Sequence, residues 1–265
     1  MTSSAQPSVI QSEPAPGLRL VTLNEPRLRN AMTAELTAEW TNVFDEIAAD
    51  PGVRAVVITG AGSAFCSGAD LSWLDQGSAG LATPDQLRER LLPFYKAWLA
   101  PRTLSVPVVA AVNGPAIGAG LALALACDVR YASTTATFRA PFILIGVHGG
   151  MAANWLLTQA VGISRAKEML FTGRELDAEQ AVSWGLVAGI SDDVVASAIE
   201  AAAMIAKAGP IATRLTKASL NQMPTNFDAA VQWDALAQPL TMATTDIHEG
   251  ILAIRERRAP SFDGR

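Results

Sequence analysis

The residues from Asn113 to Asp128 join a tight turn to an apolar helix, in a pattern that suits binding of a developing negative charge. Glycines and a proline crowd the turn, which directly follows the apolar run Val106–Val112. Such a turn can aim free backbone N–H groups at an anion, because the first N–H groups of a helix lack intrahelical partners. No acid or base occurs between Leu121 and Ala126, so the helix offers no side chain for proton transfer.

A second glycine-rich stretch, Thr59–Ser63, invites comparison with nucleotide-binding loops. A dinucleotide fingerprint needs a further glycine that opens a helix, whereas Phe65 and Cys66 follow here, so we reject a nucleotide-dependent dehydrogenase. A serine hydrolase is a poor fit, because the sequence has no Gly-x-Ser-x-Gly elbow. Cys66 with His148 as a nucleophile and its base stays open, although no spacing rule supports the pair.

The composition is typical of a globular domain with few disordered residues. Hydrophobic residues make up 50% and charged residues 17% of the 265-residue chain, enough for a full core. A formal net charge of −5 argues against a nucleic-acid partner, because proteins that grip phosphate backbones carry basic faces. Cys66 and Cys127 lie in apolar surroundings without metal-ligand spacing. We therefore expect buried, reduced thiols, no bound metal and a cytoplasmic protein.

Neither the N-terminal residues nor the most apolar run predicts a membrane partner. Residues 1–17 are polar and rich in Pro and Ser, without the basic and apolar segments of a secretory signal, so we expect a flexible leader. Val106–Cys127 is apolar and long enough to resemble a membrane span, but prolines, Asn113 and glycines divide it. We read it as a buried strand, a turn and a buried helix.

The hydrophobic pattern predicts strand–loop–helix units followed by helices alone. Strands are expected at Leu18–Leu23, Val53–Thr59 and Val106–Val112, and near 128–132 and 136–139. Helices are expected at 34–49 with Thr33 as cap, 85–100, 151–161, 164–171 with Ser164 as cap, 177–184 with Asp177 as cap, 194–208, 211–221, 225–240 and 244–258. This order predicts an α/β fold with an all-helical C-terminal part.

Several long motifs occur in the order found in one known family. They are Asn24–Met32, Val56–Asp70, Pro107–Asp128, Glu168–Leu176 with Ala181 and Trp184–Val187, and Glu249-Gly250 with Arg257 and Pro260. In these stretches the chain resembles the enoyl-CoA hydratase/isomerase, or crotonase, family over nearly its whole length.

The resemblance implies a spiral of two-strand-and-helix (ββα) units, of the ClpP/crotonase type, with a C-terminal helical trimerisation region. We expect the spiral core at residues 18–200 and the helical region at 201–265, after the leader at 1–17. The resemblance also implies an acyl-CoA thioester as ligand. It implies no cofactor beyond the coenzyme A of that substrate, and a homotrimer or a hexamer of two trimers.

The same resemblance assigns the binding residues. The backbone N–H groups of Ala69 and Ala119 would form an oxyanion hole for the thioester carbonyl as it gains enolate charge. The coenzyme would run beside Ser67, Gly68, Ala69, Asp70 and Leu71, and the substrate pocket would contain Trp73, Tyr95, Gly118, Ala122 and Phe142. Arg27 and Arg29 would meet CoA phosphates, although both also suit solvated loop charges.

The departures from the family concern carboxylates. Hydratases of the family use two glutamates, whose positions fall on Ala122 and Phe142 here. An aspartate of some isomerase- and dehalogenase-like members falls on Gly149 or Gly150. None of these positions carries a carboxylate, so we do not expect hydration by the two-glutamate mechanism.

His148 is the best remaining acid or base, because imidazole can give or take a proton near neutral pH. A loop histidine that only bonds the backbone is the plainer interpretation. Asp75, Tyr95 and Asn154 are weaker candidates. The sequence leaves open an isomerase or lyase that uses His148, and an acyl-CoA-binding protein without catalysis.

Overall fold

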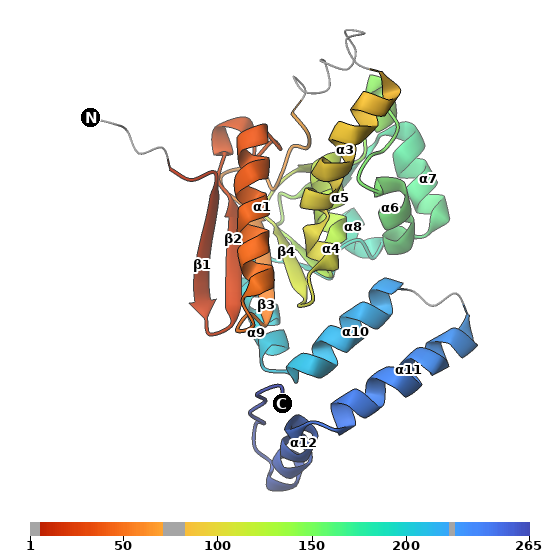
Figure 1. Cartoon of the computed structure of the whole chain (residues 1–265). Coiled ribbons are helices and arrows are strands. Elements are labelled where there is room, and N and C mark those ends of the chain that lie inside the picture. The colour runs from red at the N-terminus through yellow and green to blue at the C-terminus, as the bar shows by residue number, and fades with distance from the viewer. Residues whose placement is uncertain (1–5, 71–82, 223–225) are drawn as a thin grey trace.

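The computed structural model describes residues 6–70, 83–222 and 226–265, which fold around two sheets (Figure 1). The larger sheet has the order β1-β2-β3-β4-β6-β9 and the smaller sheet the order β5-β7-β8. The strands are β1 (Val9–Ala15), β2 (Leu18–Leu23), β3 (Ala55–Gly60), β4 (Val108–Val112), β5 (Ala116–Ile117), β6 (Val129–Ala132), β7 (Thr137–Arg139), β8 (Glu175–Asp177) and β9 (Gly189–Ile190). Only β1–β2 and β7–β8 pair antiparallel; the other neighbours are parallel.

The strands from β4 to β7 alternate between the two sheets. β4 in the larger sheet is followed by β5 in the smaller sheet and then by α5 (Ala119–Ala126). β6 and β7 repeat this order before the short η2 (Phe142–Ile145) and α6 (Ala153–Val161). This alternation confirms the predicted α/β fold of ββα turns.

The remaining helices cover the sheets and form the C-terminal part. They are η1 (Pro26–Leu28), α1 (Ala34–Ala49), α3 (Pro84–Trp98), α4 (Ala100–Thr103), α7 (Ile163–Thr172), α8 (Ala178–Ser183), α9 (Val194–Ala206), α10 (Pro210–Gln222), α11 (Phe227–Met242) and α12 (Thr245–Glu256). α9 runs across the expected boundary between residues 200 and 201, so that boundary falls within a helix.

β1 corrects the expectation of a flexible leader at residues 1–17. Val9–Ala15 pairs with β2, with Val9 opposite Leu23, and the Val9 N–H donates to Glu39 Oε2 at 2.9 Å. Most of its side chains are exposed, because β1 is an edge strand. Backbone pairing holds this strand in place, so its side chains carry little hydrophobic pattern.

The helix caps were predicted with mixed success. Thr33 and Asp177 accept hydrogen bonds from the third residue beyond them, Leu36 N–H and Gln180 N–H, as expected. Ser164 is not a cap, because α7 begins one residue earlier. Gly162 alone separates α6 from α7, and its positive φ of 78° makes the turn.

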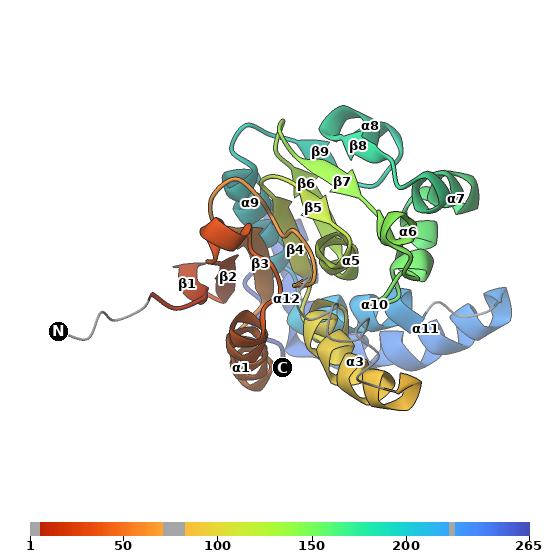
Figure 2. The ribbon, with the colours of Figure 1, turned by 90° about the horizontal axis from the view of Figure 1, so that it is seen from above.

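Aromatic packing joins α1 to α3, which lie side by side in Figures 1 and 2. Trp40 and Trp98 are fully buried and stack with ring centroids 4.7 Å apart. The Trp98 indole N–H donates to Thr37 Oγ1 at 3.0 Å, and the Trp40 indole N–H donates to Ala97 O at 2.9 Å. These contacts fix α3 and therefore the side chains that it carries.

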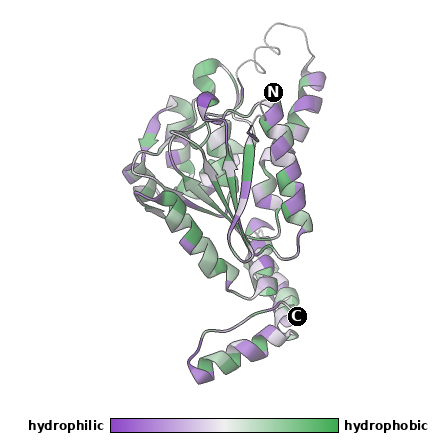
Figure 3. Cartoon of the chain, turned by 90° about the vertical axis from the view of Figure 1, so that its left-hand side faces the viewer, coloured by the Kyte–Doolittle hydropathy of each residue, from purple (hydrophilic) through white to green (hydrophobic). Residues whose placement is uncertain are grey.

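The C-terminal helices α11 and α12 project from the core (Figure 1), and Figure 3 shows apolar positions along them. Phe227, Leu236 and Ile254 are 80%, 73% and 79% exposed. A buried ion pair ties the preceding α10 to the core, with Lys217 Nζ 2.8 Å from Asp128 Oδ2. Large apolar side chains at such exposure indicate a surface that is built to be covered.

Within the described part of the chain, no single helix is long and apolar enough to cross a membrane. α9 and α10 meet that length-and-composition test only together, with a bend of 112° between them.

Candidate functional site

Two loops meet at the carboxyl ends of β3 and β4, because these neighbouring strands are parallel. The loop at 61–70 follows β3, and the turn at 113–118 follows β4. The Ile117 N–H donates to Cys66 O at 3.0 Å, and the Cys66 N–H donates to Pro115 O at 3.2 Å. Backbone pairing thus holds the two loops edge to edge.

Two asparagine side chains brace these loops from within. The buried Asn30 amide donates to Ala61 O at 3.0 Å and to Ala64 O at 2.8 Å. The Asn113 Oδ1 accepts from the Gly60 N–H at 3.0 Å. Because buried amides with full hydrogen bonding rigidify their surroundings, the loop backbones are fixed before any ligand arrives.

The glycines of the turn are required by close backbone approach. A Cβ on Gly120 would lie 2.1 Å from Cys66 O, and one on Gly68 would lie 2.7 Å from Ile117 O. Gly68 also has a positive φ of 101°. Side chains at these positions would push the loops apart.

Ala69 and Ala119, the predicted donor pair, both line the same cavity. Ala119 is the first residue of α5, so its N–H has no intrahelical carbonyl to bond. Across residues 6–70, 83–222 and 226–265, neither N–H donates any of the hydrogen bonds that hold the loops together. Gly68 faces the second donor closely, since a Cβ there would lie 3.4 Å from the Ala119 nitrogen.

The cavity between these loops, α3 and η2 is called the central pocket below. Its volume is about 620 Å³, within the range of small-molecule sites. Ala69, Gly118 and Ala119 line it, and the other lining side chains are mainly apolar: Leu91, Phe94, Tyr95, Ile117, Phe142, Ile145, Val147 and Met151.

Two polar side chains stand out in the central pocket. His148 lines it, and its Nε2 lies 3.1 Å from Asn154 Nδ2 on α6. Tyr95 lines it from α3, and burial raises the pKa of its phenol. The phenol therefore stays a neutral donor at neutral pH.

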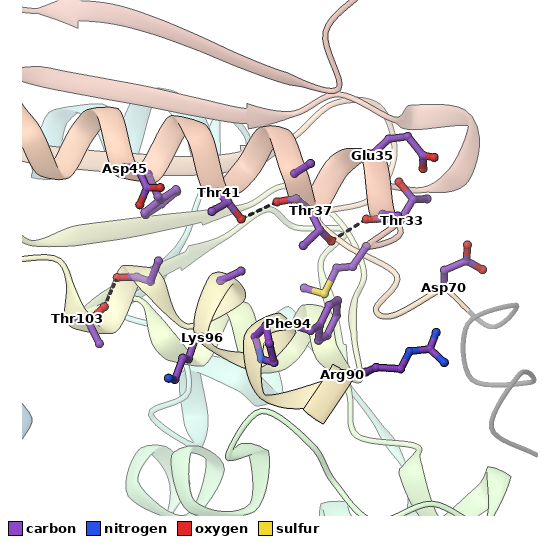
Figure 4. Close-up of a pocket in the computed structure, with 17 residues that line it drawn as sticks. Thr33, Glu35, Thr37, Thr41, Asp45, Asp70, Arg90, Phe94, Lys96 and Thr103 are labelled. Carbon is purple, nitrogen blue, oxygen red and sulfur yellow. Dashed lines mark hydrogen bonds between the residues drawn. The ribbon is translucent and has the colours of Figure 1, made fainter. Parts of the chain in front are cut away.

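A larger hollow of about 1030 Å³ lies beside the central pocket, between α1 and α3 (Figure 4). Asp70 and Phe94 line both. The hydroxyls of Thr37 and Thr41 donate to carbonyls one turn earlier in α1, at 2.6 and 2.8 Å. These hydroxyls are already engaged by their own helix, and the ionisable side chains that line the hollow are Glu35, Asp45, Asp70, Arg90 and Lys96.

The cysteines take no part in the central pocket. Cys66 and Cys127 are buried and unpaired, as predicted, and burial raises the pKa of each thiol to about 12. A thiol held protonated in the core is a poor nucleophile, which argues against a pair of Cys66 with His148. Over the described ranges, no group of His, Cys, Asp and Glu is placed to hold a metal ion.

Comparison with known proteins gives this geometry its context. A family model described as "Enoyl-CoA hydratase/isomerase" matches residues 13–265. The chain belongs to the enoyl-CoA hydratase/isomerase family. It is 42% identical to "Probable enoyl-CoA hydratase EchA14" of Mycobacterium tuberculosis over 223 residues, 84% of this chain and 85% of that protein.

Solved structures of the enoyl-CoA hydratase/isomerase family share the fold. An enoyl-CoA hydratase from Bacillus anthracis superposes with a TM-score of 0.90 at 31% identity, covering 97% of this chain and 100% of that one. A probable enoyl-CoA hydratase/isomerase from Mycobacterium abscessus gives 0.88 at 34% identity, covering 97% and 99%.

The two positions predicted to replace the family glutamates differ in their surroundings. Phe142 lines the central pocket, as expected. Ala122 does not line it, because its short side chain is fully buried within α5. Among the described lining residues, Asp70 alone carries a carboxylate, and it is also the residue next to the donor Ala69.

The structure gathers some of the other predicted residues of this family member. Ser67 and Gly68 line the central pocket. Arg27 and Arg29 lie on exposed η1 and its end and do not line it, although the Ser67 N–H donates to Arg29 O at 3.0 Å. Leu71, Trp73 and Asp75 lie outside the described residues. The CoA contacts of the arginines stay a prediction.

Several lining residues were not identified from the sequence. Leu91 and Phe94 precede Tyr95 on α3 at the spacing of one helical face, a signal that was available. Ile145 ends the short η2, and Val147 and Met151 come from the irregular backbone around His148. Such a segment has no hydrophobic periodicity that the sequence could reveal. Met151 has a positive φ of 51°, where the chain turns into α6.

Proposed function

We propose that this member of the family binds acyl-CoA thioesters in the central pocket and does not hydrate enoyl-CoA by the two-glutamate mechanism. The thioester carbonyl would accept hydrogen bonds from the N–H groups of Ala69 and Ala119. The single observation that carries this proposal is that both alanines line the same, mainly apolar cavity. Preorganised donors of this kind stabilise an enolate oxygen without a particular side chain.

The missing carboxylates limit the chemistry. General acid–base groups typically contribute about 10²–10⁴-fold each to the rate. Phe142 offers no proton, and the buried Ala122 methyl offers none either. An enoyl-CoA would therefore bind and be polarised, while water addition would lack both its base and its acid.

The test is a paired measurement on the purified protein. Titration calorimetry should detect binding of hexanoyl-CoA that is tighter than binding of CoA alone, because the acyl chain fills apolar surface. Hydration of crotonyl-CoA should fall well below the median enzyme turnover of about 10 s⁻¹. Hydration at that rate would contradict the proposal, and so would equal affinity for CoA and its thioester.

A second candidate, an isomerase or lyase that uses His148, is favoured by one observation. The imidazole lines the central pocket and is held by the Asn154 amide at 3.1 Å, as expected for a positioned acid or base. His148→Ala should leave CoA binding intact and abolish turnover. Turnover that survives this substitution unchanged would show that His148 has no catalytic role, whereas a wild-type protein without any turnover would be the non-catalytic binding protein.

We also propose a homotrimer or a hexamer of two trimers. Support comes from the exposed apolar side chains of α11 and α12, including Phe227, Leu236 and Ile254. Burial of such side chains stabilises an assembly by roughly 25 cal/mol per Å² removed from water. Light scattering coupled to size-exclusion chromatography gives the mass directly, and a monomer at micromolar concentration would contradict this proposal.

A further inference from the structure

Tyr95 brings a hydroxyl to the mainly apolar lining of the central pocket. It follows Leu91 and Phe94 on the pocket face of α3, and the stacking of Trp98 on Trp40 anchors the end of that helix in the core. The phenol is therefore carried by a rigid element. A polar group fixed in an apolar cavity is a determinant of ligand orientation and specificity.

Gly150 makes the space for this phenol. A Cβ at Gly150 would lie only 2.6 Å from the Tyr95 hydroxyl oxygen. Gly150 does not have one of the positive φ angles that favour glycine, so any residue could adopt its backbone conformation. The glycine is thus required by the position of the hydroxyl and not by the chain's conformation.

The Tyr95 hydroxyl has no hydrogen-bond partner within residues 6–70, 83–222 and 226–265. Burial raises the pKa of the phenol, so it stays a donor across the neutral range. The neighbouring His148 differs, because its Nε2 already faces the Asn154 amide. A partly buried hydroxyl without a partner costs free energy that an acceptor on a ligand would recover.

Phe142 lies close to both glycine segments that line the central pocket. A Cβ on Gly118, next to the donor Ala119, would lie 3.7 Å from Phe142 Cε1. A Cβ on Gly149 would lie 3.4 Å from Cδ2, on the opposite side of the same ring. Because the proposed donors Ala69 and Ala119 take the thioester carbonyl, an oxygen that meets the phenol would be a second one, carried by the acyl chain.

We infer that the Tyr95 hydroxyl determines acyl specificity, selecting thioesters whose acyl chain carries a neutral oxygen over plain hydrocarbon chains. The inference rests on the proposed binding of acyl-CoA. Neutral oxygen is specified because, among the described residues that line the central pocket, there is no Lys or Arg to pair with a carboxylate. A hydroxyl or a ketone provides the acceptor that the phenol lacks.

The test compares hexanoyl-CoA with 3-hydroxyhexanoyl-CoA and 6-hydroxyhexanoyl-CoA by titration calorimetry on the full chain. Tyr95→Phe removes the donor and keeps the ring. It should weaken binding of a hydroxyacyl-CoA by about two- to twelvefold, the equivalent of one neutral hydrogen bond, and leave hexanoyl-CoA unchanged. Tyr131→Phe is the matched control, since Tyr131 lies on β6 and does not line the pocket.

The outcomes separate this inference from the function on which it rests. If hexanoyl-CoA binds and Tyr95→Phe changes all three ligands equally, or none, the specificity role is wrong and the binding function stands. If none of the thioesters binds the wild-type protein, both fail. Gly150→Ala provides a second variant, because its methyl displaces the phenol, and it should cause the same selective loss. Thermal melts report whether each variant is folded.

Discussion

Removal of one backbone donor is the sharpest test of how the central pocket recognises a carbonyl. Ala119 is the first residue of α5, so its N–H serves no helical hydrogen bond. Ala119→Pro deletes this N–H and places the proline ring where the donor pointed. Ala119→Gly is the matched variant, because it changes the side chain and keeps the N–H.

The magnitudes follow from that position in the helix. Proline is favoured at the first helical position, so the free energy of unfolding should change by no more than about 1 kcal/mol. Loss of one neutral hydrogen bond to the bound thioester should raise its Kd about two- to twelvefold. Any turnover that stabilises an enolate should fall further, by about 10²–10³-fold, since the donor matters most as charge develops.

The assay is calorimetric titration of hexanoyl-CoA and of free CoA into both variants, with thermal melts alongside. Free CoA has no thioester carbonyl, so its affinity should be insensitive to the lost donor. Equal Kd values of Ala119→Pro and Ala119→Gly for hexanoyl-CoA would refute the assignment of the Ala119 N–H as an oxyanion donor.

Three other measurements probe the charges and thiols of the fold. Lys217→Met should lower the free energy of unfolding, measured by chemical denaturation, by about 3 kcal/mol. The substitution removes a buried cation that contacts Asp128 and two backbone carbonyls. A change below about 0.5 kcal/mol would contradict a stabilising role of this ion pair. Burial raises the pKa values of Cys66 and Cys127 to about 12. Neither thiol should therefore be labelled by a thiol-reactive disulfide reagent at about pH 8 until the chain unfolds. Rapid labelling of the native protein would contradict their burial. With the other tyrosine replaced by phenylalanine, phenolate absorbance should report a Tyr95 midpoint above 10.0. Because that raised pKa penalises the phenolate in the folded state, stability should fall as pH rises past 10.0, and a midpoint at or below 10.0 would contradict the burial of the phenol.

The elements whose patterns are local could be predicted from the sequence. The apolar period of α1 and the Thr33 cap gave its correct bounds, and the glycines around Ala119 marked a turn into a buried helix. Both depend on short-range physics, namely side-chain period, capping and close backbone approach. The identity of the donor residues follows from the resemblance and stays a prediction, although Ala69 and Ala119 line the same cavity.

Features that depend on distant partners could not be predicted in this way. β1 exists because its backbone completes the edge of β2, a pairing that leaves few traces in its own side chains. The Lys217 ion pair joins α10 to a residue at the end of α5, and no sequence spacing relates them. Ala122 was expected in the pocket but does not line it. Whether such a short side chain reaches a cavity depends on the rotation of its helix about the helix axis, which the sequence does not reveal.

The bracing of the donor loops by Asn30 and Asn113 has an evolutionary consequence. Under the proposed function, carbonyl recognition depends on the backbone path of these loops, which is braced independently of the side chains that line the cavity. Substitutions at positions such as Phe142 or His148 can therefore introduce or remove proton-transfer groups while the proposed binding of a thioester is retained. A lineage, or a directed-evolution library, that varies only these positions keeps its ligand while it explores new reactions.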